Sequence, residues 1–226
     1  MGDRRAALLF DFNGVIVDDE EQHRLSFAAV LADEGIALTR EQYYADYLGF
    51  DDHACFLAAY ARAGLPLNPA RARALVAEKA RRYEELTGAS LALVPGVAPF
   101  VERAAQAFRL GLVSGALRRE VARGLERASL TRYFDVVVAA EDVPACKPDP
   151  AGYLAARAAL AGRGSLDAAQ CVVIEDALPG LAAARAAGMR CAMLATSYPA
   201  AALEGADLVW RSFIGHDPGE LGVLLS

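Results

Sequence analysis

From about residue 110 onwards, short apolar runs alternate with longer amphipathic segments, and this alternation restricts the fold more than any other feature of the chain. The predicted strands cover residues 110–113, 134–140, 171–174, 191–194 and 207–210. The predicted helices between them cover residues 117–128, 150–160 and 178–187, the last ending at Gly188. Strands separated by helices of this length need crossover connections, which produce a parallel sheet with helices on both faces. We therefore expect an α/β fold.

The first strand of this sheet is separated from the others by a long helical segment. The apolar run Ala6-Ala7-Leu8-Leu9-Phe10 ends at Asp11, and the chain returns to the sheet near Val94-Pro95-Gly96. No strand pattern is present in between. Four helices are predicted there. The first covers residues 19–34, the second begins at residue 39, the third extends from residue 51 or 52 to 63, and the fourth covers residues 69–87. The sequence thus predicts an α/β core domain of residues 1–17 and 94–226, and an inserted helical domain of residues 18–93.

Composition excludes several classes of partner. The 226 residues are 55% hydrophobic, enough for one large domain or a domain with a smaller insert. The net charge is −6, the pI is about 5.2 and no basic block is present, which argues against nucleic acid. The apolar runs are far shorter than the roughly 20 residues of a membrane span. Because the N-terminus runs directly into the first strand, we expect no signal peptide and no membrane partner.

The cysteines indicate a reducing compartment. Cys55, Cys146, Cys171 and Cys191 are scattered and form no C-x-x-C pair. Free thiols in the cytoplasm are the simplest interpretation, and a zinc site is not expected because structural ligands usually come in closely spaced pairs. His23, His53 and His216 are too dispersed for a metal cluster. The sequence does not distinguish a monomer from a homodimer.

Polar residues occur at or just beyond the ends of several predicted strands. These residues are Asp11, Ser114, Lys147 and the pair Glu175-Asp176. Each has a structural alternative. Asp11 would cap a turn, Ser114 and Asp176 would cap the helices that follow them, and Lys147 would be a solvated loop residue. Together they fall on the edge where open α/β sheets bind ligands, which favours a common site.

The residue types at this edge suit phosphoryl transfer. A carboxylate such as Asp11 can attack phosphorus and form an aspartyl-phosphate. The phosphoryl oxygens then need a cation and a donor, which Lys147 and Ser114 can supply. Asp11 and Asp176, with a backbone carbonyl, make an oxygen-only site suited to Mg²⁺. Without a metal ion and a lysine, the clustered carboxylates would repel one another and any phosphate.

Four segments in this order resemble the motifs of the haloacid dehalogenase-like (HAD) phosphotransferases. They are Asp11-Phe12-Asn13-Gly14, Leu112-Val113-Ser114-Gly115, Lys147-Pro148-Asp149-Pro150 and Val173-Ile174-Glu175-Asp176-Ala177. A helical insert directly after the first motif resembles the β-phosphoglucomutase/phosphoglycolate phosphatase branch, in which the insert is a mobile cap. The segment from Asp18 to His23 is similar to the beginning of that cap. The resemblance covers nearly the whole chain.

The resemblance implies a role for each matching residue in the core. Asp11 would be the nucleophile and a Mg²⁺ ligand, and the backbone carbonyl of Asn13 would be a second ligand. Asp176 would be the third protein ligand, with Glu175 as a further ligand or directly behind the metal. Lys147 would neutralise Asp11. The phosphoryl oxygens would be held by Ser114, Gly115 and Lys147.

The resemblance also implies that part of the insert faces the substrate. In that branch a loop of the cap sets specificity, and Gly49 matches it. Glu20 and His23 lie at the predicted beginning of the cap and are candidates for contact with the substrate. Lys79 is the only lysine of the insert. We interpret it as a solvated helix residue, rather than as the Schiff-base lysine of phosphonatase-like relatives.

Asn13 is the one residue of the motifs that departs from the family. The second carboxylate of the first motif protonates the leaving alkoxide and later activates water, and an amide does neither. Three explanations remain open. Asn13 is a natural variant for which Glu20, His23 or another cap residue compensates, it is an engineered substitution, or the Asn13-Gly14 pair deamidates to aspartate. With an asparagine at this position we expect slow hydrolysis of alkyl phosphates.

These observations predict a Mg²⁺-dependent phosphatase that hydrolyses a small phosphorylated metabolite through an aspartyl-phosphate on Asp11. One alternative is a phosphomutase of the β-phosphoglucomutase type. Another is a catalytically impaired HAD scaffold with a binding or regulatory role. Receiver domains also combine Asp, Ser or Thr, Lys and Mg²⁺, but they have no place for the long insert between Asp18 and Val94.

Overall fold

The structure is a computed structural model that describes residues 6–88, 91–162 and 164–225. It divides into two compact units. The first contains residues 1–18 and 92–226, and the second contains residues 19–91. The first unit carries the sheet, which confirms the predicted α/β fold.

The sheet is parallel throughout, and one of its two central strands is β1, which directly precedes Asp11. Within the described residues it has six strands in the order β3-β2-β1-β4-β5-β6. Their bounds are Ala7–Phe10 (β1), Arg109–Val113 (β2), Val136–Val138 (β3), Cys171–Glu175 (β4), Arg190–Leu194 (β5) and Leu208–Trp210 (β6). Phe10 of β1 is in register with Leu112 of β2 and with Ile174 of β4. The residues that follow these strands therefore meet at one edge of the sheet.

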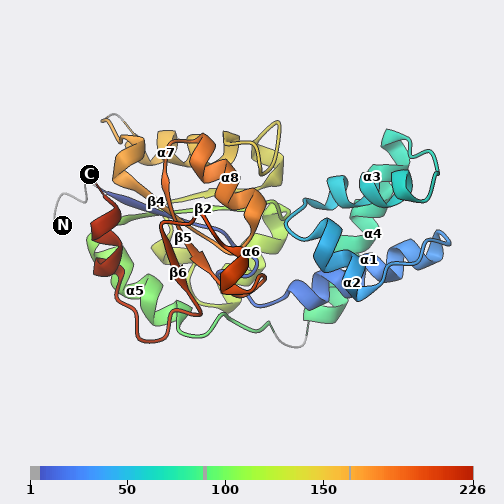
Figure 1. Ribbon diagram of the computed structural model, residues 1–226, viewed down its shortest axis with the longest axis horizontal. Helices are drawn as coiled ribbons and strands as arrows, with labels where there is room; N and C mark the ends of the chain where they lie inside the picture. Colours follow the sequence, from blue (N-terminus) through green and yellow to red (C-terminus); the bar gives the residue numbers. More distant parts are fainter. Residues whose placement is uncertain (1–5, 89–90, 163, 226) are drawn as a thin grey trace. The chain divides into compact units, whose positions relative to one another are not determined.

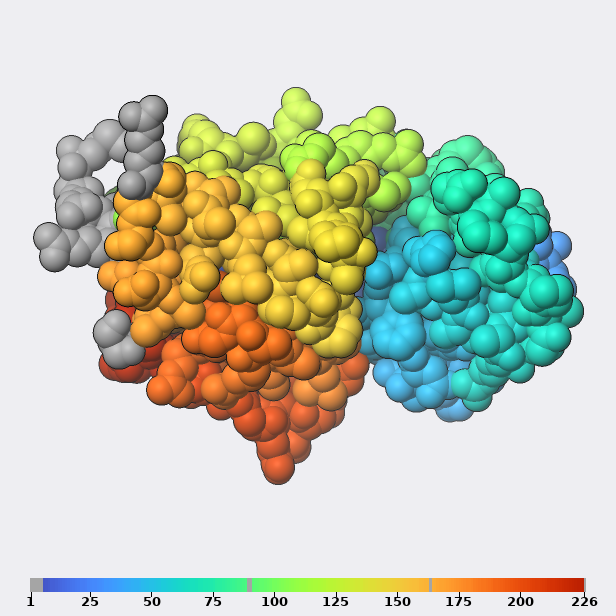
Figure 2. Space-filling view, turned by 90° about the horizontal axis from the view of Figure 1, so that it is seen from above, coloured from blue at the N-terminus to red at the C-terminus, as the bar shows by residue number. Residues whose placement is uncertain are grey.

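Helices cover both faces of this sheet (Figure 1). Helices α7 (Ala151–Ala161) and α8 (Leu178–Ala186) pack on one face, over a core that includes Leu9 of β1. Figure 2 looks onto this side, where α7 and the chain around it appear in yellow and orange. Successive strand residues point to opposite faces, so Phe10 points to the other side. There its ring contacts Phe100 of α5 (Val97–Ala107) and Phe213.

The remaining helical segments of the first unit are short. Helix α6 (Arg118–Arg127) packs against the 3₁₀ turn η2 (Thr131–Tyr133), which also contacts α5. Four other 3₁₀ segments among the described residues are η3 (Ala140–Asp142), η4 (Ala168–Gln170), η5 (Ala200–Ala202) and η6 (Pro218–Leu224).

Two elements of the sheet unit differ from the prediction. Helix α5 was not predicted, because Pro95, Gly96 and Pro99 resemble a loop. Gly96 adopts a φ of +84° immediately before the helix, and Pro99 lies in the first turn, where a proline is tolerated.

Strand β3 is shorter than the predicted 134–140. It ends at Val138 because the next residues form η3, in which Asp142 accepts a hydrogen bond from the Ala139 backbone N–H at 2.7 Å.

The second unit is helical, as predicted. Its elements are α1 (Glu20–Asp33), α2 (Arg40–Gln42), the π-helical turn η1 (Tyr43–Tyr47), α3 (Asp52–Arg62) and α4 (Pro69–Thr87). Side chains cap three of the helices at Thr39, Asp51 and Asn68, each accepting a backbone N–H of the first turn. The role of this helical unit as a cap stays a prediction.

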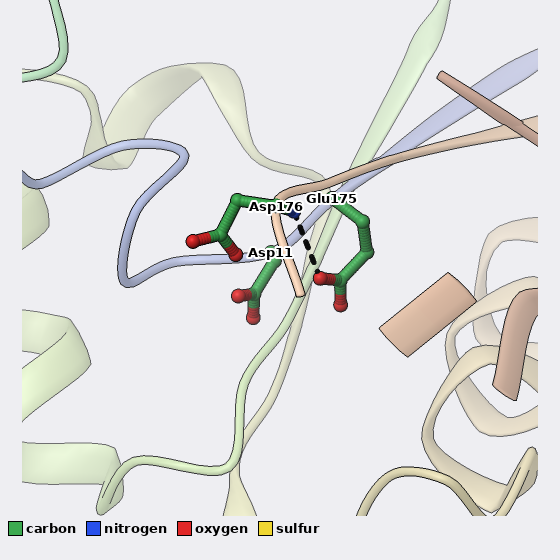
Figure 3. A group of neighbouring side chains, drawn as sticks. All are labelled: Asp11, Glu175 and Asp176. Atoms are coloured by element: carbon green, nitrogen blue, oxygen red, sulfur yellow. Dashed lines mark hydrogen bonds between the residues drawn. The ribbon is translucent and has the colours of Figure 1, made fainter. Parts of the chain in front are cut away.

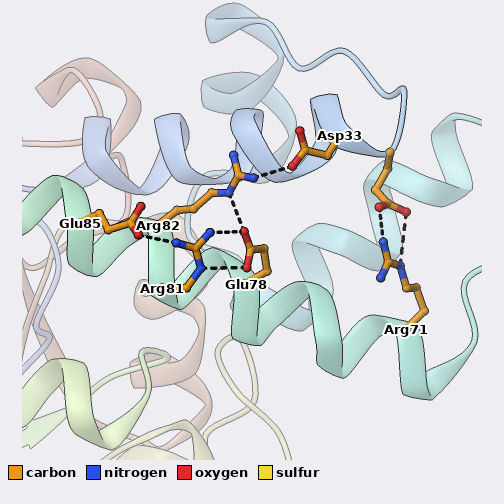
Figure 4. Close-up of polar contacts among 7 residues, drawn as sticks. Asp33, Arg71, Glu78, Arg81, Arg82 and Glu85 are labelled. Carbon is orange, nitrogen blue, oxygen red and sulfur yellow. Dashed lines mark hydrogen bonds and ion pairs between the residues drawn. The ribbon is translucent and has the colours of Figure 1, made fainter.

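Ion pairs cover the outer surface of α4 (Figure 4). Arg82 pairs with Asp33 of α1 and with Glu78, and Arg81 bridges Glu78 and Glu85 on α4 itself. Exposed pairs of this kind contribute little each, so we attribute the stability of the unit to its apolar interior, which contains Phe27, Leu31 and Phe56 among others. In the described part of the chain, no helix is long and apolar enough to cross a membrane.

Candidate active site

The polar residues that follow the central strands meet at the carboxyl edge of the sheet. The backbone N–H of Asp11 donates to the Ile174 carbonyl at 2.9 Å, so the pairing of β1 with β4 continues one residue beyond the strand. Figure 3 shows the carboxylates of Asp11, Glu175 and Asp176 gathered there. One oxygen from each lies within 4.8 Å of the others.

Lys147 lies between two of these carboxylates. Its Nζ is 2.5 Å from Asp11 Oδ1 and 2.6 Å from Glu175 Oε1, and it donates to the Val113 carbonyl at 3.0 Å. Only 13% of the Lys147 side chain is exposed. The alternative of a solvated loop lysine is therefore wrong. These contacts place the ammonium group of Lys147 beside the Asp11 carboxylate, and its role in neutralising Asp11 stays a prediction.

Glu175 is completely buried and its carboxylate is held by several donors. Oε1 accepts a hydrogen bond from the Tyr153 hydroxyl at 2.7 Å, besides the contact with Lys147. Oε2 accepts from the backbone N–H groups of Asp176 and Ala177 at 3.1 and 3.2 Å. Both Glu175 oxygens thus already have hydrogen-bonding or ionic partners within the protein. The sequence did not point to Tyr153, because nothing in its helical pattern distinguishes it from a core tyrosine.

The electrostatics of this cluster favour an additional cation. Burial raises the pKa of the Asp11 carboxyl to about 7, and the Glu175 carboxylate also raises it, against the lowering effect of Lys147. Burial alone would lower the pKa of Lys147, but Asp11 and Glu175 hold it above its usual value. One lysine therefore does not fully compensate the carboxylates. A set of carboxylate and carbonyl oxygens with excess negative charge fits a hard divalent cation such as Mg²⁺.

Asp176 packs directly on the turn that follows β1. A Cβ placed on Gly14 would lie 1.9 Å from Asp176 Oδ2, and Gly14 has a φ of +70°. Asn13 precedes it in this turn, which is closed by backbone hydrogen bonds from Ile16 and Val17 to the Phe12 carbonyl. Asp176 does not cap α8, since the N-cap of that helix is Ala177. The capping alternative for Asp176 is therefore wrong.

Ser114 and Gly115 follow β2 at the same edge. Ser114 is buried, and its backbone N–H donates to the Val138 carbonyl at 2.9 Å. Its hydroxyl accepts the Ala116 N–H at 3.0 Å, whereas the N-cap of α6 is Leu117. Ser114 thus forms a tight turn instead of the helix cap that was the structural alternative.

The other predicted site residues belong to the helical unit. The carboxylate of Glu20 accepts a hydrogen bond from Tyr43 at 2.5 Å, and Gly49 follows η1 with a φ of +82°. His23 is buried, with its Nδ1 2.6 Å from Lys79 Nζ. The expected contacts of Glu20, His23 and Gly49 with substrate stay predictions.

The expectation that Lys79 is solvated is wrong. Its side chain is completely buried. The charge is accommodated because Nζ donates to Asp52 Oδ1 at 2.8 Å and contacts His23, and it lies 4.9 Å from the Phe27 ring centre. A helical pattern does not reveal such a lysine, since its partners come from α1 and α3.

The remaining candidates behave as their patterns suggested. His53 is exposed, and His216 stacks on Trp210 with ring centres 4.3 Å apart. Trp210 is buried at the end of the edge strand β6, which confirms a packing role.

Comparison with known proteins agrees with this architecture. The family model described as haloacid dehalogenase-like hydrolase matches residues 8–194. The chain belongs to this family. Protein CbbY of Rhodobacter capsulatus is 32% identical over 85% of this chain and 86% of its own length. Hexitol phosphatase B of Escherichia coli K12 is 30% identical over 81% of both chains.

A solved structure of the same family has a similar fold. It is an aspartate-to-asparagine variant of CbbY from Rhodobacter sphaeroides, in complex with xylulose-1,5-bisphosphate. It is 28% identical, covers 92% of this chain and 94% of its own, and has a TM-score of 0.78. Together these similarities identify the chain as a HAD-like hydrolase.

Proposed function

We propose that this hydrolase is a Mg²⁺-dependent phosphatase of a small phosphorylated sugar or polyol, acting through an aspartyl-phosphate on Asp11. The observation that carries the proposal is the position of Lys147 between Asp11 and Glu175, with Asp176 beside them. The names of relatives support the substrate class, since one is a hexitol phosphatase and a second was crystallised with a sugar bisphosphate.

In the first half of the reaction, an Asp11 carboxylate oxygen attacks phosphorus, and the bond between phosphorus and the sugar oxygen breaks. The alcohol leaves after taking up a proton. Lys147 and Ser114 would stabilise the phosphoryl oxygens, and Lys147 lowers the pKa of Asp11 in opposition to burial and Glu175, which raise it to about 7. Asp11, Asp176 and the Asn13 carbonyl would hold Mg²⁺, which supplies further positive charge when bound.

In the second half, water attacks the phosphorus of the aspartyl-phosphate. The bond between phosphorus and the Asp11 oxygen breaks, inorganic phosphate leaves and the carboxylate is regenerated. This step needs a base for the attacking water, and the first step needs an acid for the leaving oxygen. The side chain of Asn13 is an amide, which is neither acid nor base at neutral pH. The proposed enzyme is therefore slow with poor leaving groups.

Replacing Asn13 tests this proposal. We expect Asn13→Asp to raise kcat on hexitol or sugar monophosphates by about a hundred-fold or more, because general acid–base groups contribute about 10²–10⁴ in rate. Hydrolysis of an aryl or acyl phosphate should change much less, because such leaving groups need no proton. The measurement is phosphate release with Mg²⁺ for both proteins, after intact-mass analysis shows that Asn13 has not deamidated.

Controls separate the competing functions. Asp11→Asn in the Asn13→Asp background should abolish turnover. Folded protein that is inactive with and without Asn13→Asp on every phosphate ester would favour a binding scaffold. A phosphomutase would instead isomerise a sugar phosphate in the presence of the matching bisphosphate and release little phosphate. Rapid native hydrolysis of a sugar phosphate, unchanged by Asn13→Asp, would contradict the role assigned to position 13.

A further inference from the structure

Two hydroxyl side chains after β5 join parts of the candidate site that are distant in the sequence. The hydroxyl of Thr196 donates to the Gly14 carbonyl at 2.7 Å. The hydroxyl of Ser197 donates a short hydrogen bond to Asp176 Oδ2. The two residues that receive these hydrogen bonds are themselves in contact, since Asp176 Oδ2 lies against Gly14.

The topology of the sheet makes these hydrogen bonds informative. Strand β5 is not a neighbour of β1, because β4 lies between them. The backbone N–H of Ala195 still donates to the Trp210 carbonyl at 2.8 Å, so the chain leaves the sheet only after this residue. Thr196 and Ser197 then reach the residues that follow β4 and β1. One dipeptide thereby connects the edges of three strands.

The consequence for Asp176 is a fixed carboxylate. Only 3% of the residue is exposed, and Oδ2 lies against the Gly14 backbone and accepts from Ser197. The hydrogen bond from Thr196 restrains the Gly14 peptide, next to the Asn13 carbonyl that we assign to the metal. Partners of this kind orient metal ligands, and their loss typically weakens metal binding by about 10- to 100-fold.

We propose that Ser197 and Thr196 are positioning residues of the Mg²⁺ site, with Ser197 holding the Asp176 carboxylate and Thr196 holding the loop that carries Asn13. This inference rests on the proposed function, because it assumes that the carboxylate cluster binds Mg²⁺. Neither residue belongs to the four motifs or touches the transferred phosphoryl group in the mechanism above.

The test measures metal binding directly, without substrate. Mn²⁺ is the probe, followed by the loss of its free-ion EPR signal, with Mg²⁺ as competitor. We expect Ser197→Ala to raise the dissociation constant about 10-fold or more, and Thr196→Val to raise it less, because Thr196 acts on a backbone carbonyl. Ser197→Thr keeps the hydroxyl and should restore most of the affinity. Ser165→Ala, at an exposed serine before β4 on the opposite edge of the sheet, is the matched control.

A kinetic readout distinguishes positioning from general damage. At saturating Mg²⁺, Ser197→Ala should recover most of the native kcat on an aryl phosphate, while the Mg²⁺ concentration for half-maximal rate rises. Circular dichroism establishes that each variant is folded. If Ser197→Ala does not fold, the positioning role is tested by comparing the Mn²⁺ dissociation constants of the native protein, Ser197→Thr and Thr196→Val.

The outcomes separate the inference from the proposed function. Native protein that binds neither Mn²⁺ nor Mg²⁺ would refute the metal-dependent phosphatase itself. Native protein that binds the ions, with folded Ser197→Ala and Thr196→Val within about twofold of it, would overturn only the positioning role. The positioning role would also be overturned if Ser197→Thr bound Mn²⁺ as weakly as Ser197→Ala, because the loss of affinity would then not come from the missing hydroxyl.

Discussion

At the scale of single residues, the candidate site is a balance of buried charge around Asp11. Its carboxylate is desolvated and lies near Glu175, and one ammonium group, that of Lys147, is shared by both. In the absence of metal this arrangement opposes ionisation of Asp11, although an ionised Asp11 is what the proposed reaction requires. The same residues thus favour metal binding and make the metal-free protein less stable.

This balance predicts a pH-dependent stability of the metal-free protein. The pKa of Asp11 is about 7 in the folded state and near 3.8 when unfolded, so the folded state binds more protons between these values. The free energy of unfolding should therefore fall as pH rises from about 4 to about 7. Above about pH 7 this contribution of Asp11 to stability is completely lost. Asp11→Asn should remove this dependence and be more stable near neutral pH by roughly 1–3 kcal/mol.

Urea unfolding in a chelator at several pH values measures the effect. Added Mg²⁺ should stabilise the native protein near neutral pH and affect Asp11→Asn much less. A native protein and an Asp11→Asn variant with parallel stability profiles would contradict the assigned burial cost. Asp149→Asn, at an exposed carboxylate two residues after Lys147, is a control for general charge effects.

Some residues of the candidate site could be predicted from the sequence, and others could not. Asp11, Ser114 and Asp176 were predictable because each directly follows an apolar strand, and parallel strands bring such positions together. Tyr153 and Ser197 were not, because one lies inside a helix and the other in a loop. Their hydrogen bonds to Glu175 and Asp176 exist only once the tertiary structure has formed.

At the scale of elements, side-chain contacts of Glu34 join α1 to two helices that follow later in the chain. Glu34 at the end of α1 accepts a hydrogen bond from Tyr60 of α3 at 2.5 Å, and it also pairs with Arg71 of α4. These two partners lower the pKa of Glu34. The contact stabilises the unit above the unfolded pKa of 4.5 and loses its effect as pH falls through the lower folded value.

Tyr60→Phe tests this contact. We expect a loss of about 1 kcal/mol in unfolding free energy near neutral pH, typical of one hydrogen bond, and a smaller loss once the pH has fallen through the lowered pKa of Glu34. Tyr44→Phe in the same unit is the control, because its hydroxyl is 3.4 Å from Glu21 and contributes little. Equal losses for both variants, or a loss independent of pH, would argue against the Glu34 contact.

Element boundaries also show why the sequence was only partly sufficient. The helix over Pro69–Thr87 was predicted to the residue, and in the structure Asn68 caps it, Pro69 begins it and Gly88 follows it. Helix α5 was missed because its own prolines and glycine are loop residues in most contexts. Its position is determined by the packing of Phe100 on Phe10 and Phe213, which no local pattern shows.

At the scale of the whole molecule, the two connections to the helical unit leave the core side by side. Val17 and Leu93 form an antiparallel bridge. The Asp18 N–H donates to the Ala92 carbonyl at 2.9 Å, and the Val94 N–H donates to the Ile16 carbonyl at 3.1 Å. The two chain segments that lead to the helical unit are therefore hydrogen-bonded to each other within the core. We infer that the sheet can form without the helical unit.

A core without the helical unit should accordingly fold. We expect a chain in which a short Gly-Ser turn replaces residues 19–91 to show a cooperative thermal transition and to bind Mn²⁺ with an affinity close to that of the full chain. It should discriminate poorly among phosphate esters, because the candidate specificity residues Glu20, His23 and Gly49 are gone. Circular dichroism and the EPR titration give the answer. An unfolded core would show that the helical unit is structurally required.

The contact between Gly14 and Asp176 limits how this sequence can change over evolutionary time. Any side chain at position 14 would occupy the space of the carboxylate at position 176, so a residue larger than glycine there requires a change at position 176. Homologues that carry alanine or a larger residue at the first position should have lost or shortened the acid at the second. An alignment of many relatives should therefore show the two columns changing together, even though the residues are far apart in the chain.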